Sequence, residues 1–268
     1  MRVVRVGYLI SGLVSLALIL YILNLIYPYY QTPTEVVLVT YDVIYLPLPK
    51  KVSNVSVEEA ILWRRSVRDY AKDPIRLEDL SMILWATYGV TEPTWGFRAT
   101  PSAGATYPLE IYLVVGEEGV LIDGNAYLVA GVYKYDGRKH LLRLVKQGDF
   151  REELYVAAIK QEWVRNAPVS IVICAVFERT TSVYGVRGEV RYVPMEVGHA
   201  GQNIYLMSTA LGYGAVVVGA FIDEDVSKVI NAGVNEVPMY IVPIGVPKTP
   251  YRTTFKDIEN YIIKARGG

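Results

Sequence analysis

A run of apolar residues without a single charge stands near the start of the chain. Residues 8–27, YLISGLVSLALILYILNLIY, would span about 30 Å as a helix that rises about 1.5 Å per residue. That length matches the hydrocarbon core of a bilayer, and a tyrosine stands at each end, where interfacial aromatic residues are common. The pattern predicts one N-terminal transmembrane helix within an anchor of residues 1–30. A cleaved signal peptide is the alternative, but YPYYQTPTE lacks a small-residue cleavage site.

Residues 31–55 have a different pattern, in which prolines interrupt short apolar runs. Pro33, Pro47 and Pro49 flank the strand-like segment EVVLVTYDVIYL. Proline removes a backbone donor and biases the preceding residue away from helix. We therefore expect an extended linker that contains one strand.

Helical and strand-like periods alternate over residues 56–250. SVEE has the form of a capping box, Ser56 with Glu59, that begins a helix, and the apolar spacing of residues 77–88 predicts a second helix that ends at Gly89. Strands are predicted at 109–116, 131–136, 140–145, 168–177, 215–221 and 238–246, and helices at 151–163, 195–214 and 223–231. Asp136-Gly137 predicts a hairpin. The order indicates an α+β domain, a mainly antiparallel sheet flanked by helices, followed by a helical tail at 251–268.

Charge and composition narrow the classes of partner. Lys and Arg number 27, as do Asp and Glu, and residues 1–30 hold only Arg2 and Arg5, so the remainder is close to neutral. A nucleic-acid partner is therefore not expected. The single cysteine, Cys174, lies in the apolar run PVSIVICAVF and is read as a buried strand thiol. His140 and His199 have no ligand-like spacing, so we expect structural roles and no metal site.

Several common catalytic motifs are missing from the sequence. It has no G-x-S-x-G nucleophile turn and no Walker-type phosphate loop. GYGAVVVGA, residues 212–220, has the wrong glycine spacing for a dinucleotide fingerprint and precedes a strand. A serine hydrolase and a nicotinamide Rossmann domain are both disfavoured.

The segment WRRSVRDYAKDPI, residues 63–75, concentrates positive charge around one hydroxyl. Arginine offers a planar fork of donors that matches phosphate oxygens, so Arg64, Arg65 and Arg68 with Ser66 could hold a phosphate monoester. The alternative is a solvated turn whose arginines pair with Asp69 and Asp73. Local chemistry leaves both open.

Five blocks in order decide between these alternatives. RRSVRDY, LEDLSMILWATYGV, RATPSAGATYPLEIYLVV, EVGHAGQNIYLMSTALGYGAVVVGAF and MYIVPIGVP resemble the nitroreductase family of FMN-dependent oxidoreductases over residues 56–250. The resemblance is greatest to the branch that includes the SagB-type, azoline-oxidising dehydrogenases of thiazole and oxazole peptide pathways. It implies a nitroreductase-like fold and a homodimer with FMN at the subunit interface.

The resemblance also implies which residues contact the cofactor. The first block would grip the phosphate, ribityl chain and ring edge, PSAGATYP would run beside the flavin, and VVGAF would bring backbone amides close to N5. The implied cofactor-binding residues are Arg64, Arg65, Ser66, Arg68, Ser102, Ala103, Gly104, Gly219 and Ala220, with Lys248 or Arg252 as a further cation at the phosphate. A site of arginines and glycines suits a cofactor that carries the hydride chemistry itself.

By the same resemblance, hydride passes from a donor, expected to be NAD(P)H, to FMN and then to a small organic acceptor in a ping-pong mechanism. The azoline-oxidising relatives carry a lysine–tyrosine pair where this chain has Val183 and Tyr184. Valine cannot act as a base, so azoline oxidation is kept only as the alternative to reduction of a small acceptor. Tyr184 is the one candidate catalytic residue. A non-catalytic, membrane-anchored flavin-binding protein and a relative without flavin are further alternatives.

The membrane side of the domain is left open by the sequence. Arg2 and Arg5 favour a cytoplasmic N-terminus and an exported domain. The supply of nicotinamide and FMN favours the inside.

Overall fold

The computed structural model describes residues 19–22 and 36–267, and residues 37–267 form the body described below. Residues 19–22 are helical. The rest of the predicted membrane helix, residues 8–27, lies outside the described residues. Among the helices that the structure does describe, none combines the length and the apolar character needed to cross a bilayer.

The main sheet has seven strands in the order β12-β13-β11-β6-β9-β10-β2, and every neighbouring pair is antiparallel. Its strands are β2 (Val43–Tyr45), β6 (Leu109–Val115), β9 (Gly131–Asp136), β10 (Leu141–Gln147), β11 (Val169–Ala175), β12 (Gly214–Ala215) and β13 (Val237–Gly245). The predicted α+β class with a mainly antiparallel sheet is confirmed. So is the hairpin at Asp136-Gly137, which joins β9 to β10.

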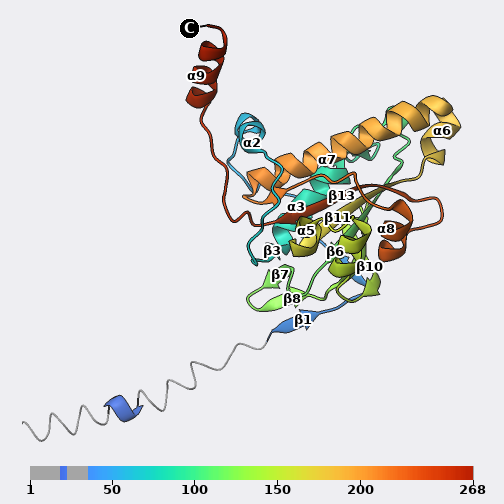
Figure 1. Ribbon diagram of the computed structural model, residues 1–268. Coiled ribbons are helices and arrows are strands. Elements are labelled where there is room, and N and C mark those ends of the chain that lie inside the picture. Colours follow the sequence, from blue (N-terminus) through green and yellow to red (C-terminus); the bar gives the residue numbers. More distant parts are fainter. Residues whose placement is uncertain (1–18, 23–35, 268) are drawn as a thin grey trace, which may run out of the picture. The chain divides into compact units, whose positions relative to one another are not determined.

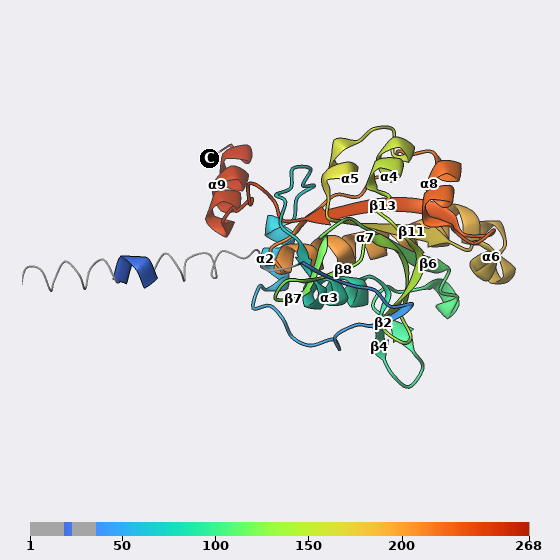
Figure 2. The ribbon, with the colours of Figure 1, turned by 90° about the horizontal axis from the view of Figure 1, so that it is seen from below.

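Helices cover both faces of this sheet. On one face lie α2 (Val57–Trp63), α3 (Leu77–Tyr88) and α7 (Val193–Ala210), and on the other lie α4 (Arg151–Ala157), α5 (Glu162–Asn166) and α8 (Asp223–Ile230) (Figure 2). Strand β6 shows why two cores form. Ile111 and Leu113 point to the α3–α7 side, whereas Tyr112 and Val114 point to the α4–α8 side, because successive side chains alternate across a sheet.

Short elements complete the body. A four-stranded sheet has the order β1-β8-β7-β3, and β4 pairs with β5. The bounds are β1 (Val37–Val39), β3 (Ile75–Arg76), β4 (Val90–Glu92), β5 (Phe97–Arg98), β7 (Val120–Asp123), β8 (Ala126–Leu128), a 3₁₀ turn at Ala103–Ala105, α6 (Glu178–Tyr184), a π-helical turn at Gly188–Tyr192, and α9 (Phe255–Ala265).

Some predicted boundaries agree closely. Ser56 and Glu59 do form the capping box of α2, and α3 covers residues 77–88 and is followed by Gly89 as predicted. Helix α9 lies within the predicted helical tail. Cys174 is buried in β11.

Other boundaries differ for visible reasons. The predicted linker 31–55 contains two strands, β1 and β2, which pair with different sheets, so the body begins at Val37 and not at Ser56. The predicted helix 151–163 is two helices, because Ile159 and Lys160 both have a φ of 55° and turn the chain between them. The predicted strand 215–221 keeps only β12 and one bridge at Val218.

Candidate active site

The arginine turn is fixed against the edge of the main sheet. Arg64 ends α2, Ser66 forms a parallel bridge with Ala215 of β12, and the amide of Val67 donates to the carbonyl of Ala215 at 2.9 Å. The two segments approach so closely that a Cβ atom on Gly214 would lie 2.6 Å from the Cβ of Val67. Glycine at 214 therefore allows the turn to dock.

Tyr205 of α7 joins this turn to the segment that follows β12. Its hydroxyl oxygen lies 2.9 Å from the hydroxyl of Ser66 and accepts a hydrogen bond from the amide of Val217 at 2.9 Å. The guanidinium of Arg64 lies 5.0 Å from the centre of the Tyr205 ring. One tyrosine thus positions the arginine turn and the backbone leading to Gly219.

Gly219 and Ala220 follow this segment and are exposed. A Cβ atom on Gly219 would meet nothing closer than Tyr240, at the ordinary contact distance of 3.7 Å. The space next to the backbone at 219 is therefore open, and a flat ligand can approach the amide there.

The guanidinium groups of this corner rest on aromatic rings. Their distances to the ring centres are 4.0 Å for Arg65 over Tyr251, 5.2 Å for Arg68 over Trp163 and 4.3 Å for Arg252 over Trp63. Within the described residues, none of these arginines, nor Arg64, forms an ion pair with a carboxylate. Asp69 pairs with Lys248 instead, at 2.6 Å. Of the alternative considered from the sequence, the pairing of these arginines with Asp69 or Asp73 is not found in the described residues, whereas Ser66 and Arg68 are exposed to solvent.

The C-terminal cations reach the same corner. Arg65 and Arg252 line one small hollow together with Trp63, Gly212 and Pro247. Trp63 fixes the arm that carries Arg252, because its indole N–H donates to the carbonyl of Thr253 at 3.0 Å. The structure therefore gathers Arg64, Arg65, Ser66 and Arg252 toward the end of α7, and we call these four residues the arginine corner. Lys248 is paired with Asp69, and Arg68 is turned toward α5. Gly219 lies farther along the sheet edge, beside Tyr240.

The loop 102–107 forms a second group. Gly104, Ala105 and Tyr107 have φ values of 59°, 52° and 46°, a left-handed conformation that strains the two residues other than glycine. Side chains hold the loop in this shape. The hydroxyl of Ser102 accepts from the amide of Tyr107 at 2.9 Å, and Thr106 donates to the carbonyl of Ala103 at 3.0 Å.

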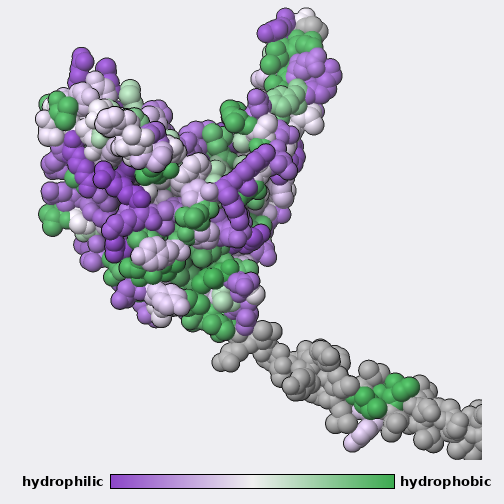
Figure 3. All heavy atoms as spheres, turned by 180° about the vertical axis from the view of Figure 1, so that it is seen from behind, coloured by the Kyte–Doolittle hydropathy of each residue, from purple (hydrophilic) through white to green (hydrophobic). Residues whose placement is uncertain are grey.

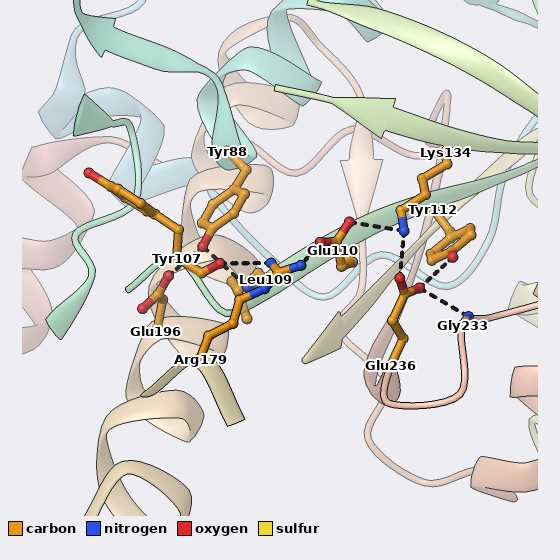
Figure 4. A network of polar contacts seen from close by, with 10 residues as sticks. All are labelled: Tyr88, Tyr107, Leu109, Glu110, Tyr112, Lys134, Arg179, Glu196, Gly233 and Glu236. Carbon is orange, nitrogen blue, oxygen red and sulfur yellow. Dashed lines mark hydrogen bonds and ion pairs between the residues drawn. The ribbon is translucent and has the colours of Figure 1, made fainter. Parts of the chain in front are cut away.

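Helix α6 supports this loop. A Cβ atom on Gly104 would lie 2.6 Å from the hydroxyl oxygen of Tyr184, so the loop and the candidate catalytic tyrosine touch. Arg179, at the start of α6, donates to the carbonyl of Tyr107 at 3.0 Å and pairs with Glu110, whose other partner is Lys134 (Figure 4). Tyr184 is 37 % exposed and its ring meets that of Tyr192 edge to face.

A buried carboxyl lies beneath the loop. Glu196, in the first turn of α7, is 3 % exposed and accepts a hydrogen bond from the Tyr88 hydroxyl at 2.6 Å (Figure 4). Burial raises the pKa of Glu196, and the hydrogen bonds from Tyr88 and Ser102 and the charge of Arg98 offset part of that rise. Glu196 thus joins the core to Ser102 of the loop.

The two groups lie toward opposite ends of α7. Loop 102–107 contacts α6 and also Glu196, which lies at the start of α7. The arginine corner contacts Tyr205, in the second half of α7, and lies beside α2 (Figure 1). Tyr205 stands nine positions after Glu196, about 14 Å along a helix axis. The predicted cofactor contacts therefore form two separate groups within one chain.

Tyr205 and Glu196 were not identified from the sequence. Tyr205 carries no local signal, since it stands among other apolar residues of a long helix. Glu196 does: together with Val193, Val197 and Ala200 it occupies the buried stripe of α7, where a lone acid indicates a specific partner.

Known proteins resemble this chain over the same region. The family model described as Nitroreductase family matches residues 61–246. A nitroreductase-family protein of Methanocaldococcus jannaschii is 44% identical over 208 residues, which cover 76% of this chain and 97% of that protein. The chain belongs to the nitroreductase family.

Membership makes the chain an oxidoreductase, and the crystal structure of a nitroreductase-family protein from Ralstonia eutropha shows the same fold. It is 26% identical with a TM-score of 0.67, and the match covers 78% of this chain and 91% of that one. Among the more distant relatives is the microcin B17-processing protein of Escherichia coli, 26% identical over 64% of this chain and 62% of its own length. The resemblance to the peptide-processing branch is therefore present but remote.

Proposed function

We propose that this nitroreductase binds FMN in a site built by two copies of the chain, and that it passes hydride from a nicotinamide donor to a small organic acceptor. One copy supplies the arginine corner and the other supplies loop 102–107 with Tyr184. The observation that carries the proposal is the arginine corner itself. Its guanidinium groups rest on aromatic rings around Ser66, without a carboxylate partner among the described residues.

The chemistry of the corner fits FMN. Arg64, Arg65 and Arg252 offer forked donors to a phosphate dianion, and Ser66 adds a hydroxyl for the ribityl chain. The open backbone at Gly219, next to the exposed Ala220, would admit the edge of a flat ring. Bound there, FMN would supply two-electron hydride chemistry, while the protein supplies orientation and donors.

Two copies would unite the two groups of predicted contacts in one site. The loop around Ser102 lies at the far end of α7 from the arginine corner. Twofold association of two chains places the same patch of each against the other, and it can bring the start of one α7 to the end of the other. A homodimer would then carry two equivalent sites, and an isolated chain would bind flavin weakly.

Tyr184 is our candidate for the donor of the proton that accompanies hydride transfer to the acceptor. Its hydroxyl touches the loop at Gly104 and its side chain is partly open to solvent. Donor and acceptor would use the same open face in turn, which gives a ping-pong mechanism. Val183, 62 % exposed, stands where azoline-oxidising relatives have a lysine, and this favours a small acceptor over a peptide azoline.

Residues 8–27 would anchor this enzyme to a membrane. The proposal rests on the uncharged run alone, and it leaves the side of the body open. Protease digestion of sealed vesicles decides the side: the body is cut from outside if it is exported and protected if it is not.

The function is tested on full-length chain purified in detergent. We expect a yellow protein that bleaches when NADH or NADPH is added without oxygen and recovers its colour when a quinone or nitroaromatic is added. A yellow protein that no nicotinamide bleaches would point to flavin storage or another donor. A colourless protein that takes up no added FMN would refute the proposal.

A further inference from the structure

We propose that a hollow beside the β9–β10 hairpin binds a small oxyanion, either a carboxylate or a phosphate. We call it the hairpin hollow, and its charged lining residues are Arg98, Lys134, Arg138, Arg143, Glu110 and Asp136. It shares no residue with the arginine corner. The inference therefore depends neither on the proposed flavin nor on a second copy of the chain.

The hairpin hollow lies where the β9–β10 hairpin meets the end of α3, and its volume is about 230 Å³. A Cβ atom on Gly137 would lie 2.5 Å from the carbonyl oxygen of Tyr88, so the hairpin packs directly against that helix end. Three of the lining residues, Tyr88, Glu110 and Lys134, are drawn in Figure 4. One water needs about 10–15 Å³ of such space, so a small ion fits together with several waters.

Arg98 brings to this hollow a guanidinium group that lacks an acceptor. The group lies between two tyrosine rings, 4.3 Å from the centre of the Tyr88 ring and 4.8 Å from that of Tyr107. Its Nε atom is buried without a hydrogen-bond partner. Glu196 lies within range of the charge, but its oxygens accept from Tyr88 and Ser102. A buried donor without an acceptor is costly, and an oxyanion that reaches the guanidinium from the hollow would offset that cost.

The other cations of the lining differ in how far they are neutralised. Lys134 pairs with two carboxylates, those of Glu110 and Glu236. Arg138 and Arg143 are exposed, and across the described part of the chain neither of them forms an ion pair. Arg143 also stands directly opposite Lys134 in the sheet, and like charges in that position destabilise a strand pair. A bound anion would relieve this repulsion.

The two acids of the lining are already engaged elsewhere. Glu110 is shared between Lys134 and Arg179 (Figure 4). The carboxylate of Asp136 accepts from the amides of Arg138 and Lys139, both at 3.1 Å. Four cations against two acids leave the lining with an excess of positive charge, which favours an anionic ligand.

Exposed charge alone does not mark a site on this protein, because hydrophilic side chains cover much of one face of the body (Figure 3). The hairpin hollow is distinguished by the partly buried guanidinium of Arg98, which lines it together with the exposed arginines. Arg98 also borders a second hollow beside loop 102–107, but that lining holds no other charged side chain. The excess of charge therefore assigns the anion to the hairpin hollow.

Isothermal titration calorimetry on the full chain in detergent tests the site. Inorganic phosphate is titrated in one arm and succinate in the other, with sodium chloride at matched ionic strength as the reference. We expect saturable binding of at least one of the two anions, and the anion that binds identifies the ligand as phosphate or carboxylate. Arg98→Gln should raise the dissociation constant about tenfold or more, and Arg143→Gln about threefold. Arg187→Gln, a change at an exposed arginine outside the hollow, should leave it unchanged.

The arginine corner is the rival site for phosphate, so the titrations are repeated on chains that carry Arg64→Ala with Arg65→Ala. Binding that persists there and is weakened by Arg98→Gln supports the hairpin hollow. Binding that disappears with the corner, or the absence of saturable binding, would overturn the proposal. If circular dichroism shows that Arg98→Gln does not fold, Arg143→Gln decides, and an unchanged dissociation constant in that variant would contradict the site.

Discussion

Replacing Tyr205 by Phe removes one hydroxyl that serves two segments of the proposed site. That hydroxyl accepts from the amide of Val217 and lies 2.9 Å from the hydroxyl of Ser66. The ring remains, so the contact with the guanidinium of Arg64 is kept. The substitution therefore separates the hydrogen bonds from the packing.

The expected magnitude follows from the group left unpaired. An amide that loses its acceptor in a partly buried position costs about 1–2 kcal/mol, which corresponds to about 2–8 °C in Tm for a domain of this size. Release of Ser66 and of the backbone near Gly219 should cost about 1 kcal/mol of FMN binding as well. That amounts to about a fivefold rise in the dissociation constant.

Apoprotein titrated with FMN, followed by quenching of flavin fluorescence, measures the second effect, and a thermal scan measures the first. Tyr133→Phe is the matched control, because its hydroxyl donates to the Val129 carbonyl at 2.7 Å within the core, in β9. It should lower Tm without weakening FMN binding. The reasoning fails if Tyr205→Phe binds FMN as tightly as the unaltered protein does.

Three further predictions concern the loop and its support. Burial raises the pKa of Glu196, so its contribution to the free energy of unfolding is fully present below the unfolded pKa of about 4.5 and is lost as pH rises through the folded value. Glu196→Gln should therefore gain stability relative to the unaltered protein as pH rises from 4 to 8 in urea titrations, and a constant difference would contradict this. Gly104→Ala should lower the free energy of unfolding by about 1–2 kcal/mol through its φ of 59° alone, with a further loss from the contact of its Cβ with the Tyr184 hydroxyl. Adding Tyr184→Phe should restore only that further loss, and full recovery of stability would contradict the role given to φ. Tyr184→Phe alone should slow reoxidation of the flavin by the acceptor and leave its reduction by nicotinamide unchanged, both followed by stopped-flow absorbance. If the variant is reoxidised as fast as the unaltered protein, Tyr184 does not donate the proton.

Much of the fold follows from periodicity in the sequence. Residues 77–88 repeat apolar side chains at helical spacing and end at Gly89, and the long central strands alternate or are apolar throughout, so α3, β6, β11 and β13 agree closely with the prediction. Shorter elements and breaks were not predicted from this periodicity. The break between α4 and α5 depends on left-handed residues at 159 and 160, neither of which is glycine or asparagine, the residue types that usually signal such a turn.

The candidate site was predictable only as separate motifs. The arginine cluster and PSAGATYP are visible in the sequence, but their placement toward opposite ends of α7 depends on tertiary contacts. Tyr205 acts through a hydroxyl that reaches two distant segments, and no local pattern encodes that reach. The stacking of Arg252 on Trp63 likewise joins residues far apart in the chain.

Complementation between two inactive variants tests the shared site most directly. One chain carries Arg64→Ala with Arg65→Ala, and the other carries Gly104→Val, which combines a positive φ with a clash at Tyr184. Each variant alone should lose flavin. Hybrid dimers isolated through two different tags contain one site with both groups of contacts intact, so they should regain about half the flavin of the unaltered dimer. Hybrids that stay as colourless as their parents would contradict a site built by two chains.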